Sequence, residues 1–313
     1  MHPAYSVILF TTSSGAGYGL LALLGLTAAT EAALPRGSAL FALLLALALV
    51  TFGLLASTFH LGRPERAWRA LSQWRSSWLS REGVLALATY PPALLLGLLY
   101  FMGRGEGWFL AAVGLVLAVL ATLTVLATGM IYATLRTIRQ WHHPLVVPLY
   151  LAFALAGGSS LLLVFANFSA FSSHLHWLVS AASLLLALVL TLLYWRSIDG
   201  QFRNLTPAAA IGLPHLVQIR EWEPAHTAEN YVQREMGYQV ARRHAGRLRS
   251  LTIFALVLAF LLVALSALLP AIGGAIAALL AALLLLVASL IQRWLFFAEA
   301  QHVVTLYYGA ERA

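Results

Sequence analysis

The chain of 313 residues contains no cysteine and no lysine, and only 10% of its residues are charged. Without cysteine thiolates it cannot by itself ligate an iron–sulfur cluster or form a disulfide bond. Without lysine it cannot form the Schiff base that a retinal protein requires. The two absences therefore exclude light-driven retinal chemistry, and they exclude iron–sulfur clusters held by this chain alone.

Ionisable residues are also scarce inside the apolar runs. The acidic residues nearest to those runs are Glu31, Glu82 and Glu299, all at run ends. Ion pumps and ion-coupled transporters usually keep ionisable groups at mid-membrane, so a transport function is disfavoured. A dihaem cytochrome needs histidines inside facing helices. We predict that no haem is bound, because every histidine lies at a run end or in a loop: 2, 60, 142, 143, 174, 176, 215, 226, 244 and 302.

The chain is rich in long apolar runs. Hydrophobic residues make up 61% of it, and its mean hydropathy is +0.85. Runs of about 20 apolar residues are long enough to cross a bilayer as helices. The pattern predicts an all-α integral membrane protein, with residues 1–313 as one membrane domain and the spans in two groups of four, which suggests two four-helix bundles. The spans are expected near 8–30, 38–59, 83–102, 108–133, 145–166, 175–195, 251–269 and 271–295.

The arginines are distributed unequally between the two faces that these spans define. With eight spans both termini lie on one face, and 17 of the 19 arginines fall on that face, including Arg293 at the end of the last run. Arg36 and Arg104 are the two on the other face. The positive-inside rule then predicts that both termini are cytoplasmic. The net charge of +8 reflects this bias and does not indicate nucleic-acid binding.

The first apolar run contains many small residues. Gly15 and Gly19 stand at G-x-x-x-G spacing, which lets a neighbouring helix approach closely. Close helix packing is the favoured interpretation of this motif. The alternative is that the small residues leave room for a ligand beside Thr11 and Thr12.

Residues 196–250 form the one substantial hydrophilic segment, which we expect to be a cytoplasmic loop with a helical second half. Its basic residues are suited to contact with anionic lipid head groups. Its tryptophan, tyrosines and mixed charge are equally suited to docking a cytoplasmic partner. The sequence leaves both interpretations open.

The segment from His60 to Glu82, HLGRPERAWRALSQWRSSWLSRE, concentrates charge and tryptophan between the second and third runs. A short antiparallel pairing of these two helices would bring His60 and Glu82 together. Imidazole exchanges protons near neutral pH, and a carboxylate can relay them, as a site for a quinone requires. Simpler alternatives remain, because His60 can be a capping or interfacial residue and the helix dipole alone favours Glu82 at a helix start.

Three segments resemble one known family. They are MHPAYSVILFTTSSGAGYGLLALLG at the N-terminus, HLGRPERAWRAL with the following SWLSREG, and EMGYQVARRHA. They are similar to the membrane-anchor subunits of the dimethyl sulfoxide reductase type, which are eight-helix relatives of the polysulfide-reductase anchors. The branch that looks most similar is that of anchors of cytoplasmic sulfite-oxidising enzymes. The long hydrophilic segment between the sixth and seventh runs departs from the better-known reductase anchors.

The resemblance implies a haem-free anchor in a bacterial cytoplasmic (inner) membrane that exchanges electrons with ubiquinone or menaquinone. It implies two partners: a ferredoxin-like subunit with iron–sulfur clusters and a catalytic subunit with molybdenum bis-pterin. The family's quinone-site residues correspond here to His60 and Glu82, with Arg66 of the P-x-R-A pattern added; no catalytic or metal-binding residue is expected in this chain. Electrons would run from sulfite to quinone. The alternatives are quinol oxidation for a sulfoxide or related oxide reductase, and a purely structural anchor.

Overall fold

The structure of the protein is a computed structural model that describes residues 4–28, 30, 32–59, 61, 63–104, 107–171, 174–201, 206–213, 215–216, 219, 222–223 and 240–308. In this part of the chain, eight helices are long and apolar enough to cross a membrane. The predicted all-α membrane fold with eight spans is therefore confirmed. The eight helices are α1 (Tyr5–Thr27), α2 (Arg36–Thr58), α3 (Trp78–Phe101), α4 (Trp108–Ala133), α5 (Val146–Phe168), α6 (His174–Gln201), α9 (Val240–Ser266) and α10 (Ala271–Ala298).

Several helices extend beyond the apolar runs that predict them. Helix α3 begins at Trp78, five residues before the expected start at residue 83, so that Glu82 lies in its second turn. Hydropathy misses this turn because it contains Ser80 and Arg81. The guanidinium of Arg81 donates to the carbonyl oxygens of Trp74 and Arg75 at 3.0 and 2.7 Å, which stabilises the polar first turn.

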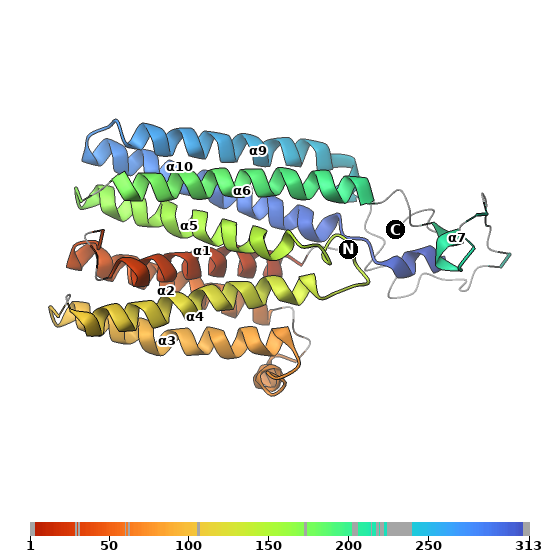
Figure 1. Ribbon diagram of the computed structural model, residues 1–313, viewed down its shortest axis with the longest axis horizontal. Coiled ribbons are helices and arrows are strands. Elements are labelled where there is room, and N and C mark those ends of the chain that lie inside the picture. Colours follow the sequence, from red (N-terminus) through yellow and green to blue (C-terminus); the bar gives the residue numbers. More distant parts are fainter. Residues whose placement is uncertain are drawn as a thin grey trace.

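Helices α1 and α5 occupy the centre of the molecule (Figure 1). Helix α1 packs against α2, α4 and α5, whereas α10 packs against α9 and α5. The 3₁₀ helices η1 (Pro64–Leu71) and η3 (Val303–Tyr308) and the short helix α7 (Pro207–Ala210) lie toward one end, which we call the loop end. Both termini also lie toward this end. The division into two four-helix bundles stays a prediction, because α1 packs on α5 as extensively as on α4.

Glycines bring the backbone of α1 into contact with three neighbouring helices. A Cβ atom on Gly19 would lie 1.8 Å from the carbonyl oxygen of Ala154 on α5, and one on Gly25 would lie 2.2 Å from that of Gly114 on α4. A Cβ atom on Gly17 would lie 2.8 Å from the carbonyl oxygen of Ala46 on α2. Only glycine fits at such approaches. The G-x-x-x-G interpretation therefore holds for Gly19 but not for Gly15, whose Cβ position has no neighbour within 4 Å.

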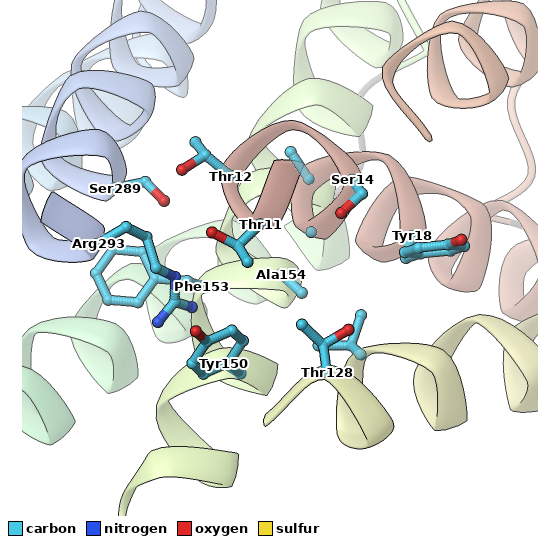
Figure 2. A pocket seen from close by; sticks show the side chains of 13 residues that line it. Thr11, Thr12, Ser14, Tyr18, Thr128, Tyr150, Phe153, Ala154, Ser289 and Arg293 are labelled. Atoms are coloured by element: carbon cyan, nitrogen blue, oxygen red, sulfur yellow. The ribbon is translucent and has the colours of Figure 1, made fainter. Parts of the chain in front are cut away.

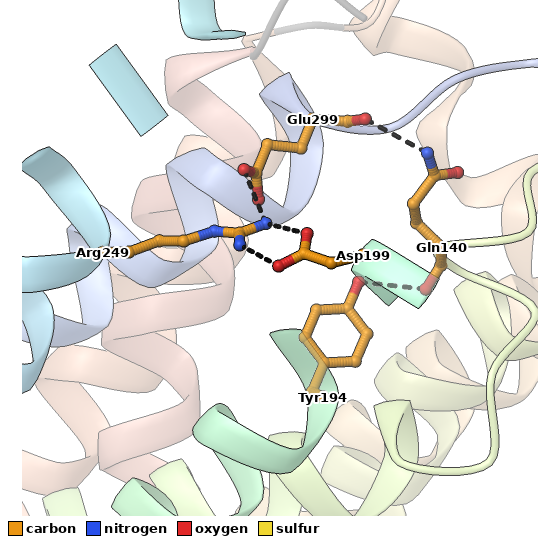
Figure 3. A network of polar contacts seen from close by, with 5 residues as sticks. All are labelled: Gln140, Tyr194, Asp199, Arg249 and Glu299. Atoms are coloured by element: carbon orange, nitrogen blue, oxygen red, sulfur yellow. Dashed lines mark hydrogen bonds and ion pairs between the residues drawn. The ribbon is translucent and has the colours of Figure 1, made fainter. Parts of the chain in front are cut away.

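An ion-pair network joins the helices of the second half at the loop end (Figure 3). The Arg249 guanidinium contacts the Asp199 carboxylate at 2.7 and 3.0 Å and the Glu299 carboxylate at 2.9 Å. The backbone carbonyl of Glu299 accepts from Gln140 Nε2 at 3.2 Å, and the Gln140 carbonyl accepts from Tyr194 Oη at 3.0 Å. Burial raises the pKa of the Glu299 carboxyl, although Arg249 opposes this effect. The network fixes α6, α9, α10 and the α4–α5 loop relative to one another.

The glycine contacts generate a prediction about stability. Gly19→Ala forces α1 and α5 apart, so we expect a loss of at least about 1–3 kcal/mol, typical of overpacking in a dense core. The measurement is the midpoint of thermal unfolding of the detergent-solubilised protein, followed by circular dichroism. Gly15→Ala is the matched control on the same helix and should be tolerated, because open space surrounds that position. Equal midpoints for the two variants would contradict the packing described here.

Candidate functional site

A cavity of about 450 Å³ lies at the loop end between α1, α2, α3, α4 and η1, and we call it the η1 cavity. Its volume is within the range of small-molecule sites in proteins. Its walls are mostly apolar, and few polar groups converge on it, which is the usual composition of a site for an apolar ligand. The polar side chains of its lining belong to Ser57, Thr58, Arg63, Arg66, Glu82 and Tyr132.

Glu82 lines the η1 cavity from the second turn of α3. Its side chain is buried, with 5% of the residue exposed, and its Oε1 accepts a hydrogen bond from the Thr128 hydroxyl on α4. A carboxyl group in a largely apolar environment is costly to keep charged, and a hydroxyl donor offsets part of that cost. Such a group is suited to hold or release a proton.

Contacts between η1 and α3 fix the wall of the cavity that carries the arginines. The Ser80 hydroxyl donates to the carbonyl oxygen of Ala70, which joins the first turn of α3 to η1. A Cβ atom on Gly83 would lie 2.8 Å from a methyl carbon of Leu71, so this glycine allows η1 to rest directly on α3. The position of the 3₁₀ helix relative to Glu82 therefore depends on these local contacts.

Arg66 lines the same cavity from η1. Its side chain is half exposed, and its nearest acidic partner, Glu65, lies 4.0 Å away on the surface. An exposed pair at that distance contributes little, so the guanidinium remains available to a ligand. The structure thus brings together Arg66 and Glu82, two of the three residues that the sequence predicts for the site. The third, His60, lies outside the described residues, whereas the next residue, Leu61, lines the cavity.

The sequence analysis missed two polar residues on α4 that lie at this site. Thr128 is buried against Glu82, and Tyr132 lines the η1 cavity. One turn of helix separates them, so both face α3 and α1. Threonine and tyrosine within an apolar run are common in membrane helices, and no spacing in the sequence links them to a carboxylate 46 positions away.

Arg293 lies in a different place from the one that the sequence indicates. The sequence analysis counts it with the basic residues of the cytoplasmic face. In the structure it lies within α10, five residues before the end of the helix at Ala298, and it is 2% exposed. The expectation that ionisable groups stay at the ends of the runs is therefore wrong for Glu82 and Arg293. Hydropathy misplaces Arg293 because α10 continues through the aromatic residues Trp294, Phe296 and Phe297.

The described residues hold no group of three or more histidine, cysteine, aspartate or glutamate side chains close enough for a metal ion. Among the histidines of this part, His176 Nε2 lies 3.1 Å from the Ala32 carbonyl oxygen and His143 Nε2 lies 2.8 Å from Ser197 Oγ. Burial lowers the pKa of His143. The expectation that the chain binds no haem stays a prediction.

The arrangement in the η1 cavity can bind an apolar ring that carries carbonyl oxygens. The guanidinium of Arg66 can donate to one oxygen, and the Glu82 carboxyl can exchange a proton with the ring. The apolar walls can exclude water from the rest of the ring. These are the features that a quinone requires, and the residues present fit such a ligand.

Comparison with known proteins is consistent with this geometry. A sequence model described as the DMSO reductase anchor subunit matches residues 1–309. A sulfite dehydrogenase subunit of Allochromatium vinosum is 34% identical over 334 aligned residues, which cover 98% of this chain and 99% of that protein. With its eight spans, the chain therefore belongs to the DMSO reductase anchor subunit family, as a multi-span membrane anchor of a DMSO reductase-type or sulfite dehydrogenase complex.

Proposed function

We propose that this anchor exchanges electrons between an iron–sulfur partner subunit and a membrane quinone that binds in the η1 cavity. The observation that carries the proposal is the convergence of Arg66 and Glu82 on one largely apolar cavity from separate elements. The cavity lies at the loop end of four spans, where an apolar ligand from the bilayer and a water-soluble partner can both reach it. Ubiquinone and menaquinone share the chemistry that this site recognises.

Each site residue has a distinct role in this proposal. Arg66 donates a hydrogen bond to a carbonyl oxygen of the quinone, and Glu82 holds one of the protons that accompany its reduction. His60, whose ordinary pKa is near neutral, exchanges the second proton with water. The quinone supplies the two-electron redox chemistry, and the chain supplies binding, orientation and proton transfer.

We further propose that electrons flow from sulfite to quinone. The relative in Allochromatium vinosum is named as part of a sulfite dehydrogenase, and the alignment covers nearly the whole of both chains. Sulfite would be oxidised at molybdenum bis-pterin in a catalytic subunit, and a ferredoxin-like subunit would carry the electrons to this chain. The family description favours the second candidate, in which quinol is oxidised here for a dimethyl sulfoxide or related oxide reductase. A purely structural anchor is the candidate from another class.

The composition of the complex tests this proposal. Purification of the tagged chain from its native host should recover molybdenum and iron with it, together with sulfite-dependent reduction of quinone. Molybdenum and iron with oxide reduction driven by quinol, and no sulfite activity, would favour the second candidate. A metal-containing complex that exchanges no electrons with quinone in either direction would support the structural anchor.

The site itself is tested by Glu82→Gln and His60→Ala in the assembled complex. Loss of a proton-transfer group lowers turnover by about 10²-fold or more, so each variant should reduce quinone-linked turnover strongly while assembly stays intact. The measurements are steady-state quinone turnover and the stoichiometry of the purified subunits. Glu65→Gln is the matched control, because Glu65 lies on η1 with 66% of its side chain exposed and does not line the cavity. Normal turnover in both test variants would place the quinone site elsewhere.

We also propose that the loop end faces the cytoplasm of a bacterial inner membrane, with both termini cytoplasmic. The distribution of arginine supports this orientation, because the positive-inside rule applies to the short loops and juxtamembrane residues. The absence of native cysteine allows a direct test with single introduced cysteines. A cysteine at Ser76 should resist a membrane-impermeant maleimide in intact spheroplasts, and one at Gly103 should react. The reverse pattern would invert the orientation.

A further inference from the structure

The guanidinium of Arg293 is buried among α1, α4, α5 and α10 without full hydrogen bonding. Its Cζ lies 3.5 Å from the centroid of the Tyr150 ring and 5.6 Å from that of Phe153. Its Nε and Nη1 are buried, and neither has a hydrogen-bond partner in the described part of the chain. Stacking on aromatic rings stabilises a cation, but it leaves these in-plane donors unsatisfied. A buried charge with unsatisfied donors is strongly unfavourable, so something must accept from them.

A small chamber adjoins this guanidinium (Figure 2). The hydroxyls of Thr11 and Ser14 also line it, but both donate to carbonyl oxygens of their own helix, at 2.9 Å to Val7 and 2.6 Å to Phe10. Thr12 differs, because its Oγ1 is buried and has no partner among the described residues. Figure 2 shows Thr12 beside Ser289, on the side of the chamber toward α10. The chamber therefore presents two unsatisfied donors from Arg293 and one unsatisfied hydroxyl from Thr12.

The size of the chamber selects its ligand. Its volume is about 10 Å³. A cavity needs roughly that volume, and two to four polar partners, to hold one water molecule. A sulfate, a phosphate or a quinone ring is far too large for it. Water can accept from the Arg293 donors and donate to Thr12, which satisfies all three groups at once.

Thr128 connects the chamber to the η1 cavity. It lines the chamber from α4, and its hydroxyl donates to Glu82 on α3, which lines the cavity. The same hydroxyl lies 3.0 Å from the carbonyl oxygen of Thr124. It can therefore donate to Glu82 when that carboxylate is charged and to Thr124 when Glu82 is protonated. In either state its lone pairs can accept a hydrogen bond from water in the chamber.

We propose that the chamber holds an ordered water that exchanges protons with Glu82 through Thr128. The proposal rests on the proposed function, in which two electrons from the iron–sulfur subunit and two protons convert quinone to quinol. Glu82 gives one proton to a quinone oxygen and becomes a carboxylate. Thr128 then gives its hydroxyl proton to Glu82 and takes one from the water, and a proton from the aqueous phase restores the water. The net change is one proton moved from solvent to quinol; quinol oxidation reverses each transfer.

The chamber is close enough to the surface for this exchange. Arg293 lies five residues before the end of α10, which corresponds to about 8 Å along the helix axis. Beyond that end lie Glu299 and its ion pair with Arg249, the polar network of Figure 3. Arg293 and Thr12 act here as positioning residues, since they hold the water and do not touch the quinone.

The test uses Thr12→Val and Thr128→Val in the assembled complex, with Thr122→Val as the matched control. Thr122 is on α4 as well, but it does not line the chamber and its hydroxyl donates to the Ala118 carbonyl at 2.8 Å. The readout is the carbonyl stretch of the protonated Glu82 carboxyl in redox-induced infrared difference spectra, assigned by its absence in Glu82→Gln. Hydrogen–deuterium exchange of this band should slow by about tenfold or more in both test variants, and affinity for a quinone-analogue inhibitor should stay unchanged.

Each outcome decides between the proposals. If the band exchanges as fast in Thr12→Val and Thr128→Val as in Thr122→Val, the water relay is wrong and the quinone site stands. If Glu82→Gln turns over quinone normally, the proposed function itself fails. Should Thr128→Val fail to assemble, Thr12→Val decides alone. A cryo-electron-microscopy map of the complex should show density for water within hydrogen-bond distance of Arg293 and Thr12, and a lipid or protein group in that place would overturn the proposal.

Discussion

Backbone contact between α1 and its neighbours positions both polar cavities. Lipid tails are as apolar as leucine, so helices associate in a membrane through close packing more than through the hydrophobic effect. Gly17, Gly19 and Gly25 permit that packing toward α2, α5 and α4. Between these contacts the same helix presents Phe10 to the η1 cavity and Thr12 to the Arg293 chamber. A change in the position of α1 would therefore alter the two cavities together.

Apolar run length was sufficient to predict the number and type of the spans, because each of the eight helices must cross the same hydrocarbon thickness. It was less accurate for the helix ends. The first turn of α3 is polar, and it is stable because Arg81 bonds to carbonyls outside the helix. Similarly, α10 continues past Arg293, whose charge resembles that of a loop residue in a hydropathy plot. Side-chain contacts of this kind depend on the folded structure and leave no periodic signal.

The candidate site was predictable to a similar extent. The hairpin between α2 and α3, together with the family motif, predicted that Arg66 and Glu82 share a site, and both line the η1 cavity. The role of His60 stays a prediction. Thr128 and Tyr132 could not be predicted, since only the packing of α4 on α3 brings them to Glu82. The room for a ligand beside Thr12 was an open alternative in the sequence, and the unsatisfied hydroxyl of that residue now supports it.

The η1 cavity lies at the same end of the molecule as both termini and the long hydrophilic segment. With the soluble subunits docked at that end, electrons would travel along one face of the membrane and never across it. Sulfite oxidation releases two protons, and quinone reduction consumes two, in the same aqueous compartment. This enzyme would then generate no membrane potential of its own. The energy of sulfite would be conserved only as reduced quinone, to be used by whichever quinol-oxidising complex shares the membrane.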